Sequence, residues 1–223
     1  MVTIPNEKAN AIVIIVFDVD QNNQQLLIDA AINNTEKVMS KKPGFISASF
    51  HKSLDGKKMA NYAQWENQEI YKQAFTNLTE QEKELGRRIS QFANNIEFNI
   101  YEGNSIISIG KEGNNTTTTT LSKEQDISTV VNVFSVEPQN QQKHIDLWKA
   151  FAEEIAQKQS GFISANLHKS FDGKRVANYA QWERKEDVEA MFKVPDPKGY
   201  TEQIQQISTQ NWGAYRVVYT SSS

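Results

Sequence analysis

The sequence contains no cysteine, no long apolar segment and little net charge, and each absence excludes a class of protein. Without cysteine, the 223-residue chain has no disulfide, no thiol nucleophile and no thiolate metal ligand. A formal net charge of −3 offers no basic surface, so we expect no nucleic-acid partner. No apolar run approaches the roughly 20 residues of a membrane-spanning helix, and the first run ends at Asp18 without a cleavage-site pattern. We therefore expect a cytoplasmic protein with no membrane partner.

The chain is an internal duplication. The six residues NYAQWE occur at positions 61–66 and again at 178–183, and a shift of 117 residues aligns the two halves without a gap over positions 11–75. Within positions 44–66, 18 of 23 residues are identical in the two copies. Such a period indicates two copies of one domain. We predict domains at 10–102 and 128–220, joined by a low-complexity linker at 103–127 that includes the run NNTTTTT.

Each copy predicts the same order of elements. A β-branched apolar run (12–19 and 130–136) is followed by a helix and then by two period-two strands around an Asp-Gly turn. A second helix follows, interrupted near 76–79 in the first copy and broken by the prolines of 194–199 in the second. A last strand is expected at 96–101 and at 214–219. The order β-α-β-β-α-β defines a ferredoxin-like α+β domain.

The third strand of each copy predicts a sheet with two partly apolar faces. In the first copy, Asn61 and Trp65 share one face, while Tyr62 and Gln64 share the other. Such a sheet favours a second packing partner in addition to the helices. We therefore expect the two repeats to pack sheet against sheet as a dimeric α+β barrel within one chain, an internal pseudo-dimer. Whether further chains associate as a homo-oligomer stays open.

Three polar or aromatic residues of the first copy form a candidate pocket. Asn61 and Trp65 would project between sheet and helices, and Tyr71 follows at the start of the second helix. An amide, an indole N–H and a phenol around an apolar space can hydrogen-bond the oxygen atoms of a flat ligand. The competing interpretation is structural, because a Trp at the end of a strand is commonly core and a buried Asn is commonly bonded to backbone.

The block GFISASFHKSLDG, then NYAQW and a Tyr six residues after the Trp, resembles the antibiotic biosynthesis monooxygenase (ABM) family. It is most similar to the small anthrone oxygenases of aromatic polyketide pathways, and the resemblance covers both halves. It implies a dimeric α+β barrel that oxidises phenols, hydroquinones or anthrones with O2 and uses no metal, flavin or haem. We therefore expect no cofactor and a small aromatic substrate that reacts with O2.

The resemblance assigns roles residue by residue. It implies that Asn61 and Trp65 are catalytic and that Tyr71 contacts the substrate. Relatives also use an arginine in the second half of the second helix, where Arg87 and Arg88 are both candidates.

The second copy departs from the family pattern. A candidate second pocket there keeps Asn178 and Trp182, has Val188 in place of Tyr71, and adds Trp148 where the first copy has Ala31. Because Trp148 could fill that space, we expect the active pocket mainly in the first repeat.

Two functions follow from these residues. The first is a cofactor-independent monooxygenase that acts on a quinol-like or polycyclic phenolic substrate. The alternative is a non-catalytic, small-molecule-binding or stress-associated module of the same fold. No metal site is expected, because His51 and His168 stand singly in their strands without a carboxylate pattern. The sequence does not identify the substrate.

Overall fold

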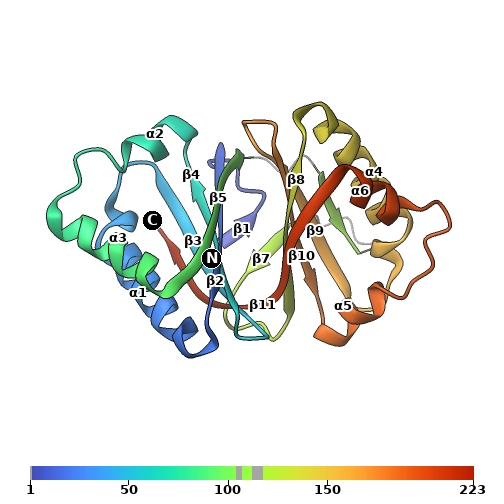
Figure 1. The fold of residues 1–223 in the computed structure, drawn as a ribbon, viewed down its shortest axis with the longest axis horizontal. Helices are drawn as coiled ribbons and strands as arrows, with labels where there is room; N and C mark the ends of the chain where they lie inside the picture. Colours follow the sequence, from blue (N-terminus) through green and yellow to red (C-terminus); the bar gives the residue numbers. More distant parts are fainter. Residues whose placement is uncertain (1, 104–106, 112–117) are drawn as a thin grey trace. The chain divides into compact units, whose positions relative to one another are not determined.

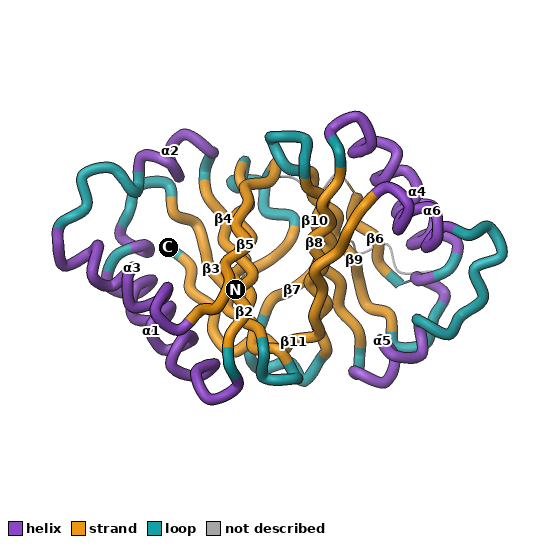
Figure 2. The backbone as a smooth tube through the Cα atoms, in the orientation of Figure 1, coloured by secondary structure: helices purple, strands orange, loops and turns teal. Residues whose placement is uncertain are grey.

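The computed structural model describes residues 2–103, 107–111 and 118–223, and the chain divides into two compact units. The first unit comprises described residues 2–103, 120–125 and 215–223, and the second comprises 107–111, 118–119 and 126–214. The segments 104–106 and 112–117 of the predicted linker lie outside the described residues. Figures 1 and 2 together label the helices and strands of each unit, and Figure 2 shows that the helices of each unit lie to one side of its own strands.

The first unit has the predicted ferredoxin-like order. Its main strands run in the order β5-β2-β4-β3, and all of these pairs are antiparallel. The elements are β1 (Val2–Ile4), β2 (Ala11–Val19), α1 (Gln24–Lys37), β3 (Phe45–Ser53), β4 (Lys58–Trp65), α2 (Gln68–Gln73), α3 (Glu80–Phe92), β5 (Ala93–Glu102) and β7 (Thr119–Leu121). Short 3-10 turns lie at Gln21–Asn23 and Met39–Lys41.

The second unit repeats this plan with strand order β11-β8-β10-β9, and β6 adds a further strand beside β9. Its elements are β6 (Ile107–Gly110), β8 (Ser128–Val136), α4 (Gln141–Glu154), β9 (Phe162–Lys169), β10 (Arg175–Trp182), α5 (Lys185–Met191), α6 (Tyr200–Ile207) and β11 (Ser208–Ser222). Here the 3-10 turns lie at Pro138–Asn140 and Ala156–Lys158. The prediction of two ferredoxin-like α+β repeats in one chain is confirmed.

The Asp-Gly hairpin is built in the same way in both units. In the first, the Asp55 carboxylate accepts hydrogen bonds from the Ser53 hydroxyl (2.7 Å) and the Lys57 amide (2.9 Å). Gly56 takes a positive φ of 79°, a conformation that costs glycine little. Asp172 and Gly173 repeat this turn. The expected role of the two aspartates as turn residues is therefore confirmed.

The second helix is interrupted in both units, as predicted. In the first unit, Thr79 caps α3 by accepting from the Glu82 amide, and the Glu82 carboxylate accepts in return from the Thr79 amide. This reciprocal cap satisfies two amides that have no partner within the helix, so a new helix begins there. In the second unit, the segment with Pro195 and Pro197 separates α5 from α6.

Each unit is completed by a segment that lies beyond its repeat in the sequence. Residues 215–222 of β11 pair antiparallel with β3, so the end of the chain belongs to the first unit. In the second unit, β6 pairs antiparallel with β9, with Ile107 opposite Leu167 and Ile109 opposite Ala165. Each compact unit therefore includes a strand from outside the matching predicted repeat. Each strand covers a sheet edge that would otherwise expose unpaired backbone groups.

Side chains alternate strictly across β4. Met59, Asn61, Ala63 and Trp65 face the helices, and Ala60, Tyr62 and Gln64 face the other way. The helix side packs on α1, where Ile28, Ala31 and Thr35 are buried, and Val38 directly after the helix is buried as well. No helix in the described part of the chain is long and apolar enough to cross a membrane.

The first prediction concerns the end of the chain. Truncation after Ala214 should destabilise the first unit by about 3 kcal/mol, since it removes the buried Tyr215 and the β11 ladder on β3. Hydrogen exchange should show loss of protection in Phe45–Ser53. Truncation after Ser222 is the control and should leave that protection in place. Unchanged exchange of β3 in the long truncation would contradict the strand assignment.

The second prediction concerns His144, which is fully buried on α4 and has no hydrogen-bond partner among the described residues. Burial lowers the pKa of His144 to about 4 from 6.5. Below pH 6.5, His144 is therefore protonated in the unfolded chain but stays neutral in the folded chain. The free energy of unfolding falls as the pH drops toward 4.

The first repeat has the buried Leu27 at the position of His144. His144→Leu should reduce the loss of unfolding free energy between pH 7.5 and 4.5 by roughly 1–3 kcal/mol. Urea unfolding followed by tryptophan fluorescence measures this, because Trp148, Trp182 and Trp212 all lie in the second unit. The remaining dependence belongs partly to His51, whose pKa burial also lowers to about 4. An unaltered pH dependence in the variant would refute the assignment.

Candidate functional site

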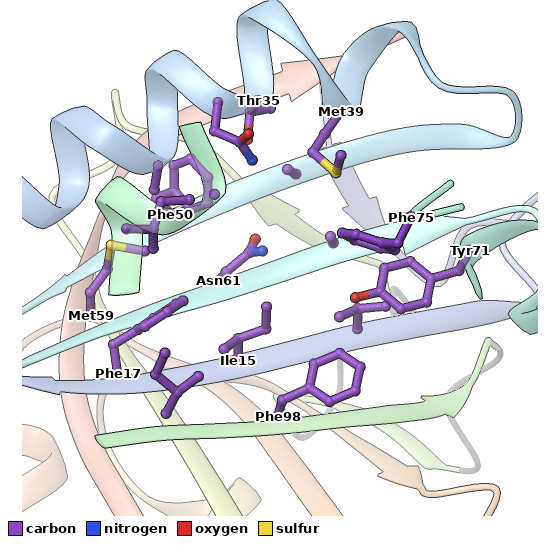
Figure 3. Close-up of a pocket in the computed structure, with 18 of the residues that line it drawn as sticks. Ile15, Phe17, Thr35, Met39, Phe50, Met59, Asn61, Tyr71, Phe75 and Phe98 are labelled. Atoms are coloured by element: carbon purple, nitrogen blue, oxygen red, sulfur yellow. The ribbon is translucent and has the colours of Figure 1, made fainter. Parts of the chain in front are cut away.

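A cavity of about 320 Å³ lies between the sheet and the helices of the first unit. Its floor is formed by β2, β3, β4 and β5, and its roof by α1 and α3. Figure 3 shows Asn61 pointing from β4 into this space, toward the helix that carries Thr35. Trp65 and Tyr71 also line the cavity. The structure therefore brings together all three residues of the candidate pocket predicted from the sequence.

Asn61 sits in the cavity with an unsatisfied amide. Its Oδ1 atom is buried and has no hydrogen-bond partner within the described chain. On β2, its direct cross-strand neighbour is Ile15, which offers no polar group. A buried carbonyl oxygen without a partner costs about 1–3 kcal/mol, so a residue that served packing alone would be expected to be apolar or bonded. The arrangement suits an acceptor held ready for a ligand.

Aromatic rings form one end of the cavity. The Trp65 ring packs edge-on against Phe45 at 5.4 Å and against Tyr71 at 5.2 Å, measured between ring centroids. Tyr71 in turn contacts Phe75 edge-on at 5.0 Å and stacks on Phe98 at 6.0 Å. Burial raises the pKa of the Tyr71 phenol, which therefore stays protonated and can donate a hydrogen bond.

The two candidate arginines lie outside the cavity. Arg87 and Arg88 are on α3, with more than half of each side chain exposed, and both pair with Glu84 at 3.0 Å and 3.6 Å. Neither lines the cavity, whereas Gly86, Ile89 and Ser90 of the same helix do. The structure therefore does not bring these arginines together with Asn61, Trp65 and Tyr71.

The second unit has its own cavity, of about 290 Å³, at the equivalent place. Asn178, Trp182 and Trp148 all line it, and Trp148 leaves the cavity open. The edge-on ring pair of the first unit recurs as Phe162 and Trp182 at 5.2 Å. Val188 stands where the first unit has Tyr71, so the phenol is missing from this cavity.

The second cavity is richer in polar groups than the first. Asn132 and Gln210 line it and are joined by a hydrogen bond of 3.0 Å from the Asn132 amide to the Gln210 oxygen. Asp196 lies at the same cavity and accepts from the amide (2.7 Å) and hydroxyl (2.8 Å) of Thr201. Burial raises the pKa of Asp196, but these hydrogen bonds outweigh it and hold the pKa below its usual value. The carboxylate is therefore ionised at neutral pH.

Sequence reasoning missed several residues that line the cavities. In the first unit these are Asn34, Met39, Phe75, Gly86, Ser90 and Phe98, and in the second Asn132, Asp196, Thr201 and Gln210. For Asn132 a signal existed. Antiparallel pairing of the first and third strands puts position 132 opposite position 178, on the same face as Asn178. The helical residues gave no such signal, because their faces depend on how α3 and α6 sit on the sheet.

Among the described residues, no three His, Asp or Glu side chains gather closely enough to hold a metal ion. His51 and His168 are buried in β3 and β9, and the Nδ1 atom of His51 lies 3.3 Å from the Ala60 carbonyl oxygen. His51 is not among the residues that line either cavity.

Two ferredoxin-like α+β domains, each with an aromatic cavity between sheet and helices, define the class of this protein. The chain belongs to the antibiotic biosynthesis monooxygenase family, whose sequence profile matches residues 10–83 and 127–202. The resemblance noted in the sequence is thereby confirmed for both repeats.

The chain is similar to known proteins both in sequence and in structure. Tetracenomycin-F1 monooxygenase from Streptomyces glaucescens is 41% identical over 76 residues, which cover 34% of this chain and 68% of that protein. The crystal structure of an anthrone oxidase-like protein matches with a TM-score of 0.81 at 20% identity and covers 99% of this chain and 96% of its own. The structure of a major regulator of staphylococcal pathogenesis matches with a TM-score of 0.53 at 12% identity, over 94% of this chain and 99% of that one. At such identities the likeness of the two structures shows the fold alone.

The third prediction separates a ligand-binding role of Asn61 from a packing role. Asn61→Leu should raise the free energy of unfolding by about 1 kcal/mol, because it replaces a buried, unbonded amide with an apolar group of similar size. The same variant should lose ligand binding, a trade between stability and function that binding sites commonly show. Chemical denaturation measures the first effect. A clear loss of stability would mean that the amide serves the fold.

Proposed function

We propose that the chain is a cofactor-independent monooxygenase that oxidises a quinol-like or polycyclic phenolic substrate with O2, mainly in the cavity of the first unit. The observation that carries this proposal is the buried, unpartnered Oδ1 atom of Asn61 inside an apolar cavity lined by Trp65 and Tyr71. Family membership supports oxygenase chemistry, and the relative from Streptomyces glaucescens is named as a monooxygenase.

The shape and lining of the first cavity favour a flat, apolar substrate. Three large hydrophobic side chains that line it are also exposed: Phe75 (45%), Ile96 (43%) and Phe98 (47%). Exposed apolar side chains that gather at the mouth of a cavity are typical of a ligand entrance. A planar ring system would pass between them and lie against the Trp65 and Tyr71 rings.

Hydrogen bonds in the cavity can orient and activate such a substrate. A phenolic hydroxyl would donate to Asn61 Oδ1. When this hydroxyl gives its proton to water at the cavity entrance, the same carboxamide can turn to present its N–H to the oxyanion. The protonated Tyr71 phenol supplies a second donor. Hydrogen-bond donors in a site shielded from bulk water stabilise developing charge more strongly than water does.

The substrate itself supplies the electrons in this proposal. Its anion passes one electron to triplet O2, and the two radicals combine to form a peroxide. In an anthrone, a methylene carbon loses two hydrogens and keeps one oxygen atom, while the second oxygen leaves as water. The protein binds the ring, favours the anion and excludes water from the peroxide.

The first unit is favoured over the second by particular side chains. Tyr71, the buried phenol that can donate to an oxyanion, is replaced by Val188 in the second unit. Trp148 also lines the second cavity, but it leaves that cavity nearly as large as the first and so does not decide between the two. Arg87 and Arg88, which face solvent and pair with Glu84, take no part in the proposed reaction.

The fourth prediction uses equivalent substitutions in the two repeats. Ala63 and Ala180 occupy the same position on β4 and β10, each between the Asn and the Trp of its own cavity. Ala63→Leu would place an isobutyl group in the cavity beside Asn61. The variant should lower turnover at least about 100-fold by displacing the substrate. Ala180→Leu carries the same packing cost and should leave turnover nearly unchanged. Asn61→Ala should lower turnover roughly 100-fold through loss of the hydrogen bond.

Oxygen consumption by the purified chain measures these effects, with anthrone and a panel of hydroquinones as substrates and autoxidation subtracted. Circular dichroism and thermal unfolding confirm that the variants fold. If Ala180→Leu abolishes turnover and Ala63→Leu does not, the active cavity is in the second unit. Saturable binding without oxygen consumption across the panel would instead indicate the non-catalytic, small-molecule-binding module.

A further inference from the structure

We infer that the cavity of the second unit is a binding site for a planar aromatic ligand that donates two neighbouring hydrogen bonds, which Asn132 and Asn178 accept. This site differs in chemistry from the first cavity, and the inference holds whether or not the first cavity is an oxygenase site. It rests on side chains in which the two repeats have diverged.

The two asparagines stand side by side. Asn178 of β10 is the direct cross-strand partner of Asn132 of β8, so both side chains leave the same face of the sheet. Directly opposed residues in antiparallel strands have Cβ atoms about 4.5–5.5 Å apart. Both residues line the same cavity. Two carboxamides are thereby presented together to whatever occupies it.

Both amides have an acceptor to spare. The Oδ1 atoms of Asn132 and Asn178 are buried, and neither has a hydrogen-bond partner in the parts of the chain that the structure describes. Asn178 is only 8% exposed, so solvent does not compensate the side chain. The Asn132 amide group is fixed by its bond to Gln210, which holds Asn132 Oδ1 as an acceptor. A ligand with two hydrogen-bond donors would satisfy both of these oxygen atoms.

The equivalent pair in the first unit is Asn61 opposite Ile15. That unit therefore offers one carboxamide where the second offers two. The Ile-to-Asn difference places a polar group at a cavity wall where the first repeat has an apolar one. Such a change costs stability unless a ligand uses it, which makes Asn132 a specificity-determining residue of the second cavity.

The remaining lining fits a ring that carries donors. Trp182, Trp148 and Phe162 provide aromatic walls. Phe192 also lines the cavity, is 67% exposed, and lies 5.3 Å from Trp212 between ring centroids, so apolar rings stand at the opening as well. The ionised Asp196 adds a further acceptor and disfavours anionic ligands. Vicinal hydroxyl groups on a fused ring system have the required shape and donor pair.

The probe is 2,3-dihydroxynaphthalene, and 2,3-dimethylnaphthalene is its control, since a methyl group fills nearly the space of a hydroxyl but donates nothing. Both are titrated under nitrogen into the full chain labelled with 5-fluorotryptophan, so that no oxidation takes place. The fluorine resonances of Trp65 and Trp182, assigned from Trp→Phe variants, report the first and second cavity separately. One titration thus yields a dissociation constant for each site.

The diol should shift the Trp182 resonance saturably and bind the second cavity at least about tenfold more tightly than the dimethyl compound. Asn132→Ile, which installs the residue of the first repeat, should weaken the diol about tenfold and spare the control compound. The reverse change, Ile15→Asn, should strengthen binding of the diol at Trp65, and this arm does not depend on the folding of the second unit. Equal affinities for the two compounds, an unmoved Trp182 resonance, or full diol affinity in Asn132→Ile would each overturn the inference.

Discussion

The alternation of side chains along β4, and along β10 in the second repeat, is the constraint on which both cavities depend. A strand sends successive side chains to opposite faces, so the motif Asn-Tyr-Ala-Gln-Trp is divided between two environments. Asn61, Ala63 and Trp65 line the cavity, whereas Tyr62 and Gln64 are buried on the other face. A shift of register by one residue would exchange the two sets, taking the amide and the indole out of the cavity. Each repeat therefore keeps the motif intact while its surroundings change.

The differences between the repeats concern what surrounds this fixed pair of residues. Three equivalent pairs of side chains that line the cavities differ in polarity or size between the repeats: Ile15 and Asn132, Tyr71 and Val188, and Ala31 and Trp148. Duplication supplies the same scaffold twice, so one copy can change its ligand chemistry while the other retains the first. A chain segment from outside the repeat completes the sheet of each unit: β6 covers the edge of β9, and the end of β11 covers the edge of β3. The sequence of either repeat alone thus lacks part of the unit that it forms.

Much of the fold could be predicted because its signals are local. The Asp-Gly turns, the prolines after α5 and the alternation of β4 each depend on a few neighbouring residues. The structure confirms the elements predicted from them. The pairing of residues 215–222 with β3 could not be predicted, since edge pairing joins strands that lie far apart in the sequence and carries no local pattern. Asn61, Trp65 and Tyr71 could be placed together, because two share a strand face and the third follows closely. Gly86, Ser90 and Gln210 could not, because their place in a cavity depends on how α3 packs on the sheet and on which strands β11 pairs with.

The central claim is that Asn61 is an acceptor for a ligand and does not serve packing. It is tested most directly by a crystal structure of the chain soaked with a hydroquinone under nitrogen, so that the ligand can donate a hydrogen bond to Asn61 Oδ1 but cannot be oxidised. The account predicts a flat ligand in the first cavity, against Trp65 and Tyr71, with its oxygen within about 3 Å of the Asn61 carboxamide. A cavity that stays empty at saturating ligand, or a ligand whose oxygen points away from Asn61, would contradict it.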